Sequence, residues 1–87
     1  MNGRRVYPNF DSPWVDYLAE GDYCQNPDGK WLVRPPLSGP GYLTLLGPRE
    51  NGWTVTEHED GTISASPSIK TARWHGFLDH GVWKGLA

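Results

Sequence analysis

Three features are scarce in this sequence: cysteine, clustered basic residues and long apolar runs. Its 87 residues contain one cysteine, Cys24, which excludes an intramolecular disulfide and any zinc site built from cysteines alone. The eight Lys and Arg residues are scattered along the chain, and the formal net charge is −2. Because a phosphate backbone requires a concentrated basic face, this distribution argues against nucleic-acid binding.

The chain also lacks the apolar segments that take proteins to or through membranes. No stretch approaches the roughly 20 apolar residues of a membrane-spanning helix. The arginines near the N-terminus are not followed by the apolar region of about 7–15 residues that a secretory signal requires. We therefore expect a soluble, cytoplasmic protein without a membrane partner.

Aromatic residues, by contrast, are abundant for so short a chain, with five Trp, four Tyr and two Phe. A chain of this length, residues 1–87, forms a single small domain with a small core. Each buried ring removes a large apolar area from water, so most of these side chains should lie in the core. Because that core cannot easily hold all of them, we expect one or two to be exposed at a contact surface.

The N-terminal part of the chain carries the clearest helix signals. Residues 1–10 are expected to form an arm, and residues 11–21, DSPWVDYLAEG, a helix of about two turns. Asp11 or Ser12 can cap this helix, Pro13 suits its first turn, and Gly21 ends it.

Residues 30–86 show β-type patterns instead. The turn NPDG leads into a short strand over 30–34, and a second strand is expected over 42–46. Hairpins are predicted over 53–66 and 74–86. The predicted fold class is therefore α+β and mainly β: a small antiparallel sheet or partly open barrel of about five or six short strands, with one short N-terminal helix.

In the hairpin over 53–66, a three-residue turn that ends at Gly61 places Val55 opposite Ala65. Alternation then gives one apolar face and one hydroxyl-bearing face. Pro67 is expected to end the second strand, because proline cannot donate to the ladder.

In the hairpin over 74–86, a three-residue turn of the same kind, Asp79-His80-Gly81, places Phe77 opposite Trp83 as a cross-strand aromatic pair. His80 then lies at an exposed turn tip. His75 projects on the side of Phe77, so these two histidines are not expected to converge.

No pattern in the sequence predicts a catalytic or metal centre. His58, His75 and His80 show no H-x-x-x-H spacing, and the chain has no C-x-x-C pair. The stretch Ser64–Ser68 lacks a G-x-S-x-G context, and the glycines stand singly at turns. We predict that the protein is not an enzyme and has no cofactor and no metal site.

Surface recognition remains as the predicted role. Tyr and Trp often anchor protein interfaces, and those of the N-terminal half are the least firmly assigned to the core by their pattern. The candidate binding residues are Trp14, Tyr17, Trp31, Tyr42, His75 and Trp83.

The stretches DGTISASPSI and WHGFLDHGVW resemble a family of small uncharacterised proteins encoded by bacteriophages and prophages. The resemblance covers roughly the last 35 residues. The matching residues are Asp60, Gly61, Thr62, Ile63, Ser66, Pro67, Ser68, Ile69, Trp74, His75, Gly76, Phe77 and Gly81. Some relatives carry upstream cysteine clusters that could hold zinc, whereas this chain has only Cys24.

The resemblance implies a phage protein that acts in the host bacterial cytoplasm. We therefore expect a binder of a host protein, as an inhibitor or modulator of the host-takeover or anti-defence type. The alternatives are a virion or assembly accessory protein with a phage partner, and a metal-dependent enzyme centred on His75. The sequence does not identify the partner or the oligomeric state.

Overall fold

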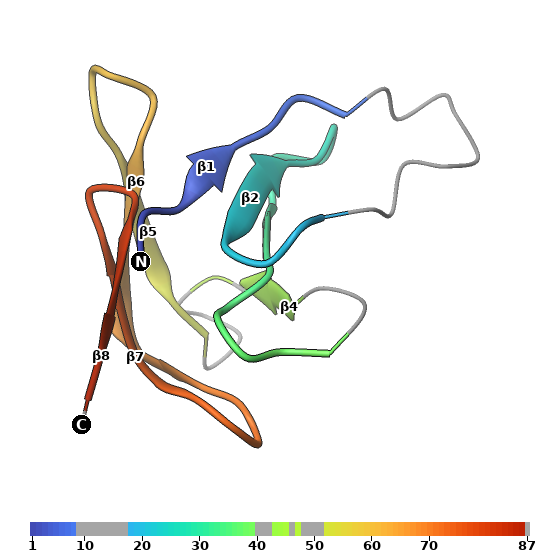
Figure 1. Cartoon of the computed structure of the whole chain (residues 1–87). Coiled ribbons are helices and arrows are strands. Elements are labelled where there is room, and N and C mark those ends of the chain that lie inside the picture. Colours follow the sequence, from blue (N-terminus) through green and yellow to red (C-terminus); the bar gives the residue numbers. More distant parts are fainter. Residues whose placement is uncertain (9–17, 40–42, 46, 48–51, 87) are drawn as a thin grey trace.

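In the computed structural model, the described residues form eight strands in two four-stranded sheets (Figure 1). The residues that the structure describes are 1–8, 18–39, 43–45, 47 and 52–86. The first sheet contains, in spatial order, β1 (Arg4–Arg5), β2 (Asp22–Gln25), β3 (Trp31–Val33) and β4 (Leu43–Leu45). The second contains β5 (Thr54–Glu57), β6 (Ile63–Lys70), β7 (His75–Asp79) and β8 (Val82–Gly85). The pair β1–β2 is parallel and the other neighbours are antiparallel.

This all-β architecture corrects the expected α+β fold with one sheet or barrel. The described residues contain no helix: of the predicted helix over 11–21, residues 18–21 form an extended segment and a turn, and residues 11–17 lie outside the described part. Backbone groups here bond to strands and turns rather than to a helix. Gly21 N donates to Arg34 O at 2.7 Å, and Ala19 N donates to the Asp22 carboxylate at 3.0 Å.

The main core lies between the two sheets. In Figure 1 the β5–β8 sheet, coloured yellow to red, lies beside the β1–β4 sheet, coloured blue to green. The buried residues of this core are Tyr23, Trp31, Val33, Leu45, Ile63, Ala65, Ile69, Leu78 and Trp83. Alternation along each strand supplies them, because every second side chain points to the same face.

A smaller apolar cluster covers the other face of the first sheet. Leu18, Cys24 and Leu32 are buried there, with Val6 packed against them. Because both faces are covered, all three residues of β3 are buried. The second sheet differs, since its face away from the core carries exposed side chains.

The hairpin β5–β6 has the register that the sequence predicts. Glu57 pairs with Ile63 and Val55 pairs with Ala65, around a turn in which Gly61 has a φ of 87°. The expectation that Pro67 ends the second strand was wrong, because β6 continues to Lys70. Pro67 lies where the pairing with β7 shifts register, and an irregular ladder tolerates a residue without an N–H.

The predicted register of the hairpin β7–β8 was wrong by one residue. Leu78 pairs with Trp83 and Phe77 pairs with Lys84, around a two-residue turn formed by His80 and Gly81. These two residues have φ values of 47° and 76°, as the tight turn that matches strand twist requires. The cross-strand pair Phe77–Trp83 therefore does not form: Trp83 is 2% exposed and Phe77 is 40% exposed.

The segment before β1 connects the two sheets. Trp83 N donates to Met1 O at 2.8 Å and Gly3 N donates to Gly81 O at 2.7 Å, so this segment lies along β8 before it enters the first sheet as β1. The indole N–H of Trp83 also donates to Gly21 O at 2.9 Å in the interior.

A second connection between the sheets uses Arg5. Its guanidinium donates to the Glu57 carboxylate at 2.7 Å and to Gly61 O at 3.0 Å. It also lies over the Trp31 ring, 4.8 Å from the ring centroid. The turn between β5 and β6 is thereby held against the first sheet.

Candidate functional site

The surface of the second sheet that faces away from the core is the candidate functional site, and we call it the outer face. Cross-strand partners share a face, so the pairing registers place its members together. Its members are Thr54, Thr56, Ser64, Ser66, Lys70, His75, Phe77, Asp79 and Lys84.

A trough of about 400 Å³ lies on the outer face. Ser64 and Ser66 of β6 are small and form part of its floor, because they lie between the larger side chains of β5 and β7. Thr54 and Thr56 line it from β5, and Phe77 lines it from β7. The result is an aromatic surface surrounded by hydroxyl groups, which can take an apolar group and donate or accept hydrogen bonds around it.

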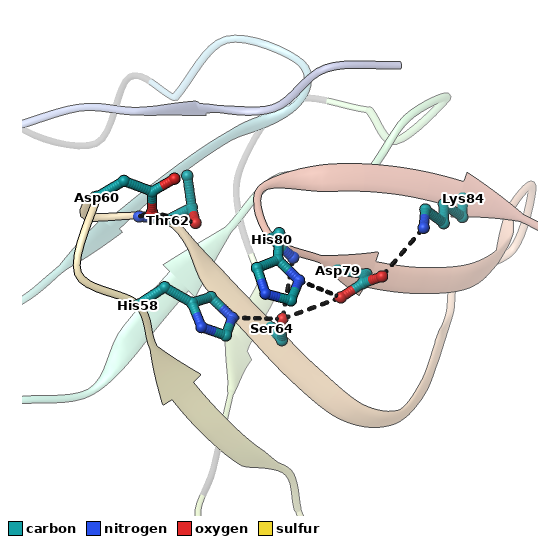
Figure 2. Close-up of polar contacts among 7 residues, drawn as sticks. All are labelled: His58, Asp60, Thr62, Ser64, Asp79, His80 and Lys84. Atoms are coloured by element: carbon teal, nitrogen blue, oxygen red, sulfur yellow. Dashed lines mark hydrogen bonds and ion pairs between the residues drawn. The ribbon is translucent and has the colours of Figure 1, made fainter.

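A polar network lies at the end of the trough nearest the two hairpin turns (Figure 2). The Asp79 carboxylate accepts hydrogen bonds from Ser64 Oγ at 3.2 Å and from Lys84 Nζ at 3.0 Å, and it contacts His80 Nδ1 at 2.7 Å. Hydrogen bonds from Lys84 first, and from His80 next, lower the pKa of Asp79 to about 2. Asp79 is therefore ionised at neutral pH and acts only as an acceptor.

The rings of His58 and His80 stack on each other at this end. Their centroids are 3.8 Å apart and their planes are 9° from parallel. His58 follows β5 and His80 is in the turn between β7 and β8, so the stack joins the tips of the two hairpins, as Figure 2 shows. His75 and His80 were not expected to converge, and local sequence carries no signal for the contact of His58 with His80, which depends on how the two hairpins pack.

The group Ser64, His58 and Asp79 contains the residue types of a catalytic triad but not its arrangement. Ser64 Oγ has three contacts: it accepts from His80 N at 2.9 Å, lies 2.7 Å from His58 Nε2 and donates to Asp79. The single proton of the Ser64 hydroxyl cannot serve both Asp79 and His58, so when Asp79 receives it, His58 Nε2 is the donor to Ser64. A nucleophilic serine instead gives its proton to histidine, and an acid orients that histidine. Among the described residues, no carboxylate is hydrogen-bonded to His58.

The described residues contain no group of three or more His, Cys, Asp or Glu side chains that could hold a metal ion. Cys24 is 1% exposed, and burial raises the pKa of its thiol. Chemistry at this thiol is therefore disfavoured in the folded protein.

The six binding residues predicted from the sequence do not lie on one surface in the part of the chain that the structure describes. Trp31 is 7% exposed and Trp83 is 2% exposed, so both rings belong to the core and do not reach a surface partner in this conformation. His75 lies on the outer face with its Nε2 2.8 Å from Ser68 Oγ. The remaining three, Trp14, Tyr17 and Tyr42, lie outside the described residues.

Sequence reasoning missed Phe77 as a candidate because it paired that residue with Trp83. A two-residue turn over His80 and Gly81 moves Phe77 to the outer face, and the His-Gly dipeptide was the available signal. Histidine and glycine both tolerate positive φ better than most residues.

The sequence matches no protein-family model, and neither a curated protein nor a solved structure matches it. Within the described ranges, no helix is long and apolar enough to cross a membrane. The function is therefore argued from the outer face itself: an exposed aromatic ring beside a hydroxyl-lined trough, bounded by a saturated polar network.

Proposed function

We propose that this protein is a non-enzymatic binding protein and that the outer face of the second sheet contacts a partner protein. The observation that carries the proposal is the trough beside Phe77, which is 40% exposed although Trp83 of the neighbouring strand is buried. Protein interfaces combine aromatic anchors with a polar, hydrogen-bonding rim. The outer face has this composition.

The strands hold these groups before any partner arrives. Phe77 is on β7 and pairs with Lys84 of β8, and its neighbours Gly76 and Leu78 pair with β6 on the other side. At the end of the trough, the contacts of Ser64 with His58 and with the Asp79 carboxylate hold these side chains as well. Preorganisation of this kind reduces the conformational entropy that is lost on binding.

The partner that we propose is a protein of a bacterial host, and the binding would block or redirect it, as a phage inhibitor of the host-takeover or anti-defence type does. Support for this part comes from the resemblance of residues 60–81 to phage and prophage proteins. Assembly with a phage protein is the alternative use of the same surface.

An affinity capture from bacterial lysate tests the proposal, with wild-type protein compared with Phe77→Ala and Tyr7→Ala. Tyr7 is a matched control because it is 78% exposed but is not among the residues that line the trough, and its ring lies next to Arg5. We expect one dominant host protein with wild type and Tyr7→Ala, and its loss with Phe77→Ala. Equal capture by all three proteins would show that the outer face is not the binding surface.

A further inference from the structure

The outer face differs in charge from the rest of the protein. Lys70 and Lys84 lie on it with one carboxylate, Asp79, which gives it a formal charge of +1 in a chain of net charge −2. The neighbouring acid on β5, Glu57, points to the other side of the sheet and pairs with Arg5 at 2.7 Å. The surface that carries the trough is therefore positively charged, and Glu57 lies on the opposite face of the sheet.

Both lysines can meet a partner. Among the described residues, Lys70 forms no ion pair. Lys84 pairs with Asp79 at 3.0 Å, but both side chains are exposed, by 59% and 44%. Exposed pairs of this kind contribute little and can be exchanged for a partner's carboxylate.

The spacing of these groups matches an extended chain. Lys84 is directly opposite Phe77, and Lys70 is opposite His75, two residues from Phe77 along β7. That separation is about 7 Å, the distance between residues i and i+2 of an extended segment, whose side chains point the same way.

We propose that the trough binds an extended acidic segment of the partner protein. An aromatic or aliphatic side chain of that segment lies in the trough against Phe77, and a carboxylate two residues further along meets Lys70. A second carboxylate near the apolar residue meets Lys84. This inference rests on the proposed function and specifies the chemistry of the partner.

A nucleic acid fits the outer face less well. Two lysines neutralise few phosphates, whereas nucleic-acid binding requires a concentrated basic face. An acidic protein segment needs only two positive contacts and gains from burial of its apolar side chain.

Fluorescence anisotropy with labelled synthetic peptides tests the inference. The first peptide has Leu followed two residues later by Glu; the second has Lys in place of Glu, and the third has Ala in place of Leu. We expect wild-type protein to bind the first peptide most tightly. The Phe77→Ala variant should bind it about thirtyfold more weakly, which is the loss typical of an interface anchor. Lys70→Glu should weaken binding about fivefold.

Two variants serve as matched controls, and circular dichroism verifies that each protein is folded. Lys30→Glu makes the same charge change on the exposed turn between β2 and β3, and Tyr7→Ala removes an exposed ring from the segment that follows β1. Both should bind the acidic peptide as wild type does.

Three results would overturn the inference: absence of peptide binding, tighter binding of the Lys peptide, or equal effects of Lys70→Glu and Lys30→Glu. Displacement of the acidic peptide by a single-stranded oligonucleotide at equal concentration would assign the face to nucleic acid instead. If capture from lysate depends on Phe77 but none of the peptides binds, the inference of an acidic partner segment is wrong and the proposed function stands. If capture is independent of Phe77, the proposed function fails.

Discussion

Replacement of Gly81 by alanine should destabilise the protein more than replacement of Gly61, although both glycines occupy hairpin turns. Their φ values are similar, 76° for Gly81 and 87° for Gly61, so the backbone strain of an alanine is similar at the two positions. The surroundings differ. A Cβ at Gly81 would lie 2.8 Å from Tyr23 Oη and 3.0 Å from Thr62 Cγ2, whereas the nearest atom to a Cβ at Gly61 is 3.7 Å away.

The cost of backbone strain and the cost of overpacking can be estimated separately. Left-handed backbone costs an L-residue about 1–2 kcal/mol, and the lower entropy of the unfolded alanine chain returns about 0.4–1 kcal/mol. Gly61→Ala should therefore cost about 1 kcal/mol. Gly81→Ala adds an overpacking cost of about 1–3 kcal/mol, for a total of about 2–4 kcal/mol. The turn cannot easily move away, because Gly81 N donates to Ile63 O and Gly81 O accepts from Gly3 N.

Urea unfolding followed by tryptophan fluorescence measures both variants, and linear extrapolation gives each free energy of unfolding. Gly61→Ala is the control for backbone strain alone. Equal losses for the two variants, within about 0.5 kcal/mol, would refute the close packing of the β7–β8 turn against Tyr23. A larger loss for Gly61→Ala would refute the ordinary contact distances found around that residue.

Asp79 should contribute to stability at neutral pH, because its folded pKa of about 2 is below the value of about 3.9 in an unfolded chain. The contribution of Asp79 is complete above about pH 5 and is lost as the pH falls towards 2. The free energy of unfolding from urea titrations should therefore fall more steeply over that range for wild type than for Asp79→Asn. Equal slopes for the two proteins would contradict this. Trp83→Phe should lower the free energy of unfolding by about 2 kcal/mol in the same assay, because it removes the indole N–H bond to Gly21 O and part of a buried ring. A change near zero would show that this hydrogen bond is not made. Cys24 should react with a thiol reagent only as the protein unfolds, since it is 1% exposed and burial raises the pKa of its thiol; rapid labelling in native buffer would contradict its burial.

The hairpin β5–β6 was predictable from local sequence. Alternating apolar and hydroxyl residues specify the faces, and Gly61 ends a three-residue turn that sets the register. Because a one-residue slip would turn Ile63, which is 0% exposed, towards water, the register is strongly determined.

The hairpin β7–β8 was not fully predictable, because both of its faces carry apolar residues. Leu78 or Phe77 could each be assigned to the core, and the choice depends on whether the turn has two or three residues. The three-residue turn was predicted by likeness to the turn that ends at Gly61, whereas the two-residue turn puts His80 at a positive φ, which is uncommon for a residue other than glycine. That choice placed Trp83 on the same face as Phe77 and hid the outer face.

The first sheet and the polar network depend on contacts that are distant in sequence. Arg4 and Arg5 form β1 through parallel pairing with β2, and no apolar alternation marks them as a strand. The stack of His58 and His80 likewise arises only when two hairpins lie side by side. Local patterns predicted strands and turns, whereas the candidate site required the tertiary arrangement.

The backbone pairing of Met1 and Gly3 with β8 has a kinetic consequence. During synthesis, residues 1–3 can make these contacts only after residues 81–83 have emerged from the ribosome. Contacts of such long sequence separation slow folding, because the chain must close a large loop before it gains their energy. Until then β5–β7 can pair, but residues 1–3 do not yet lie along β8 at the edge of the second sheet. The solubility of the nascent protein in that period depends on how quickly residues 1–3 and 81–83 meet.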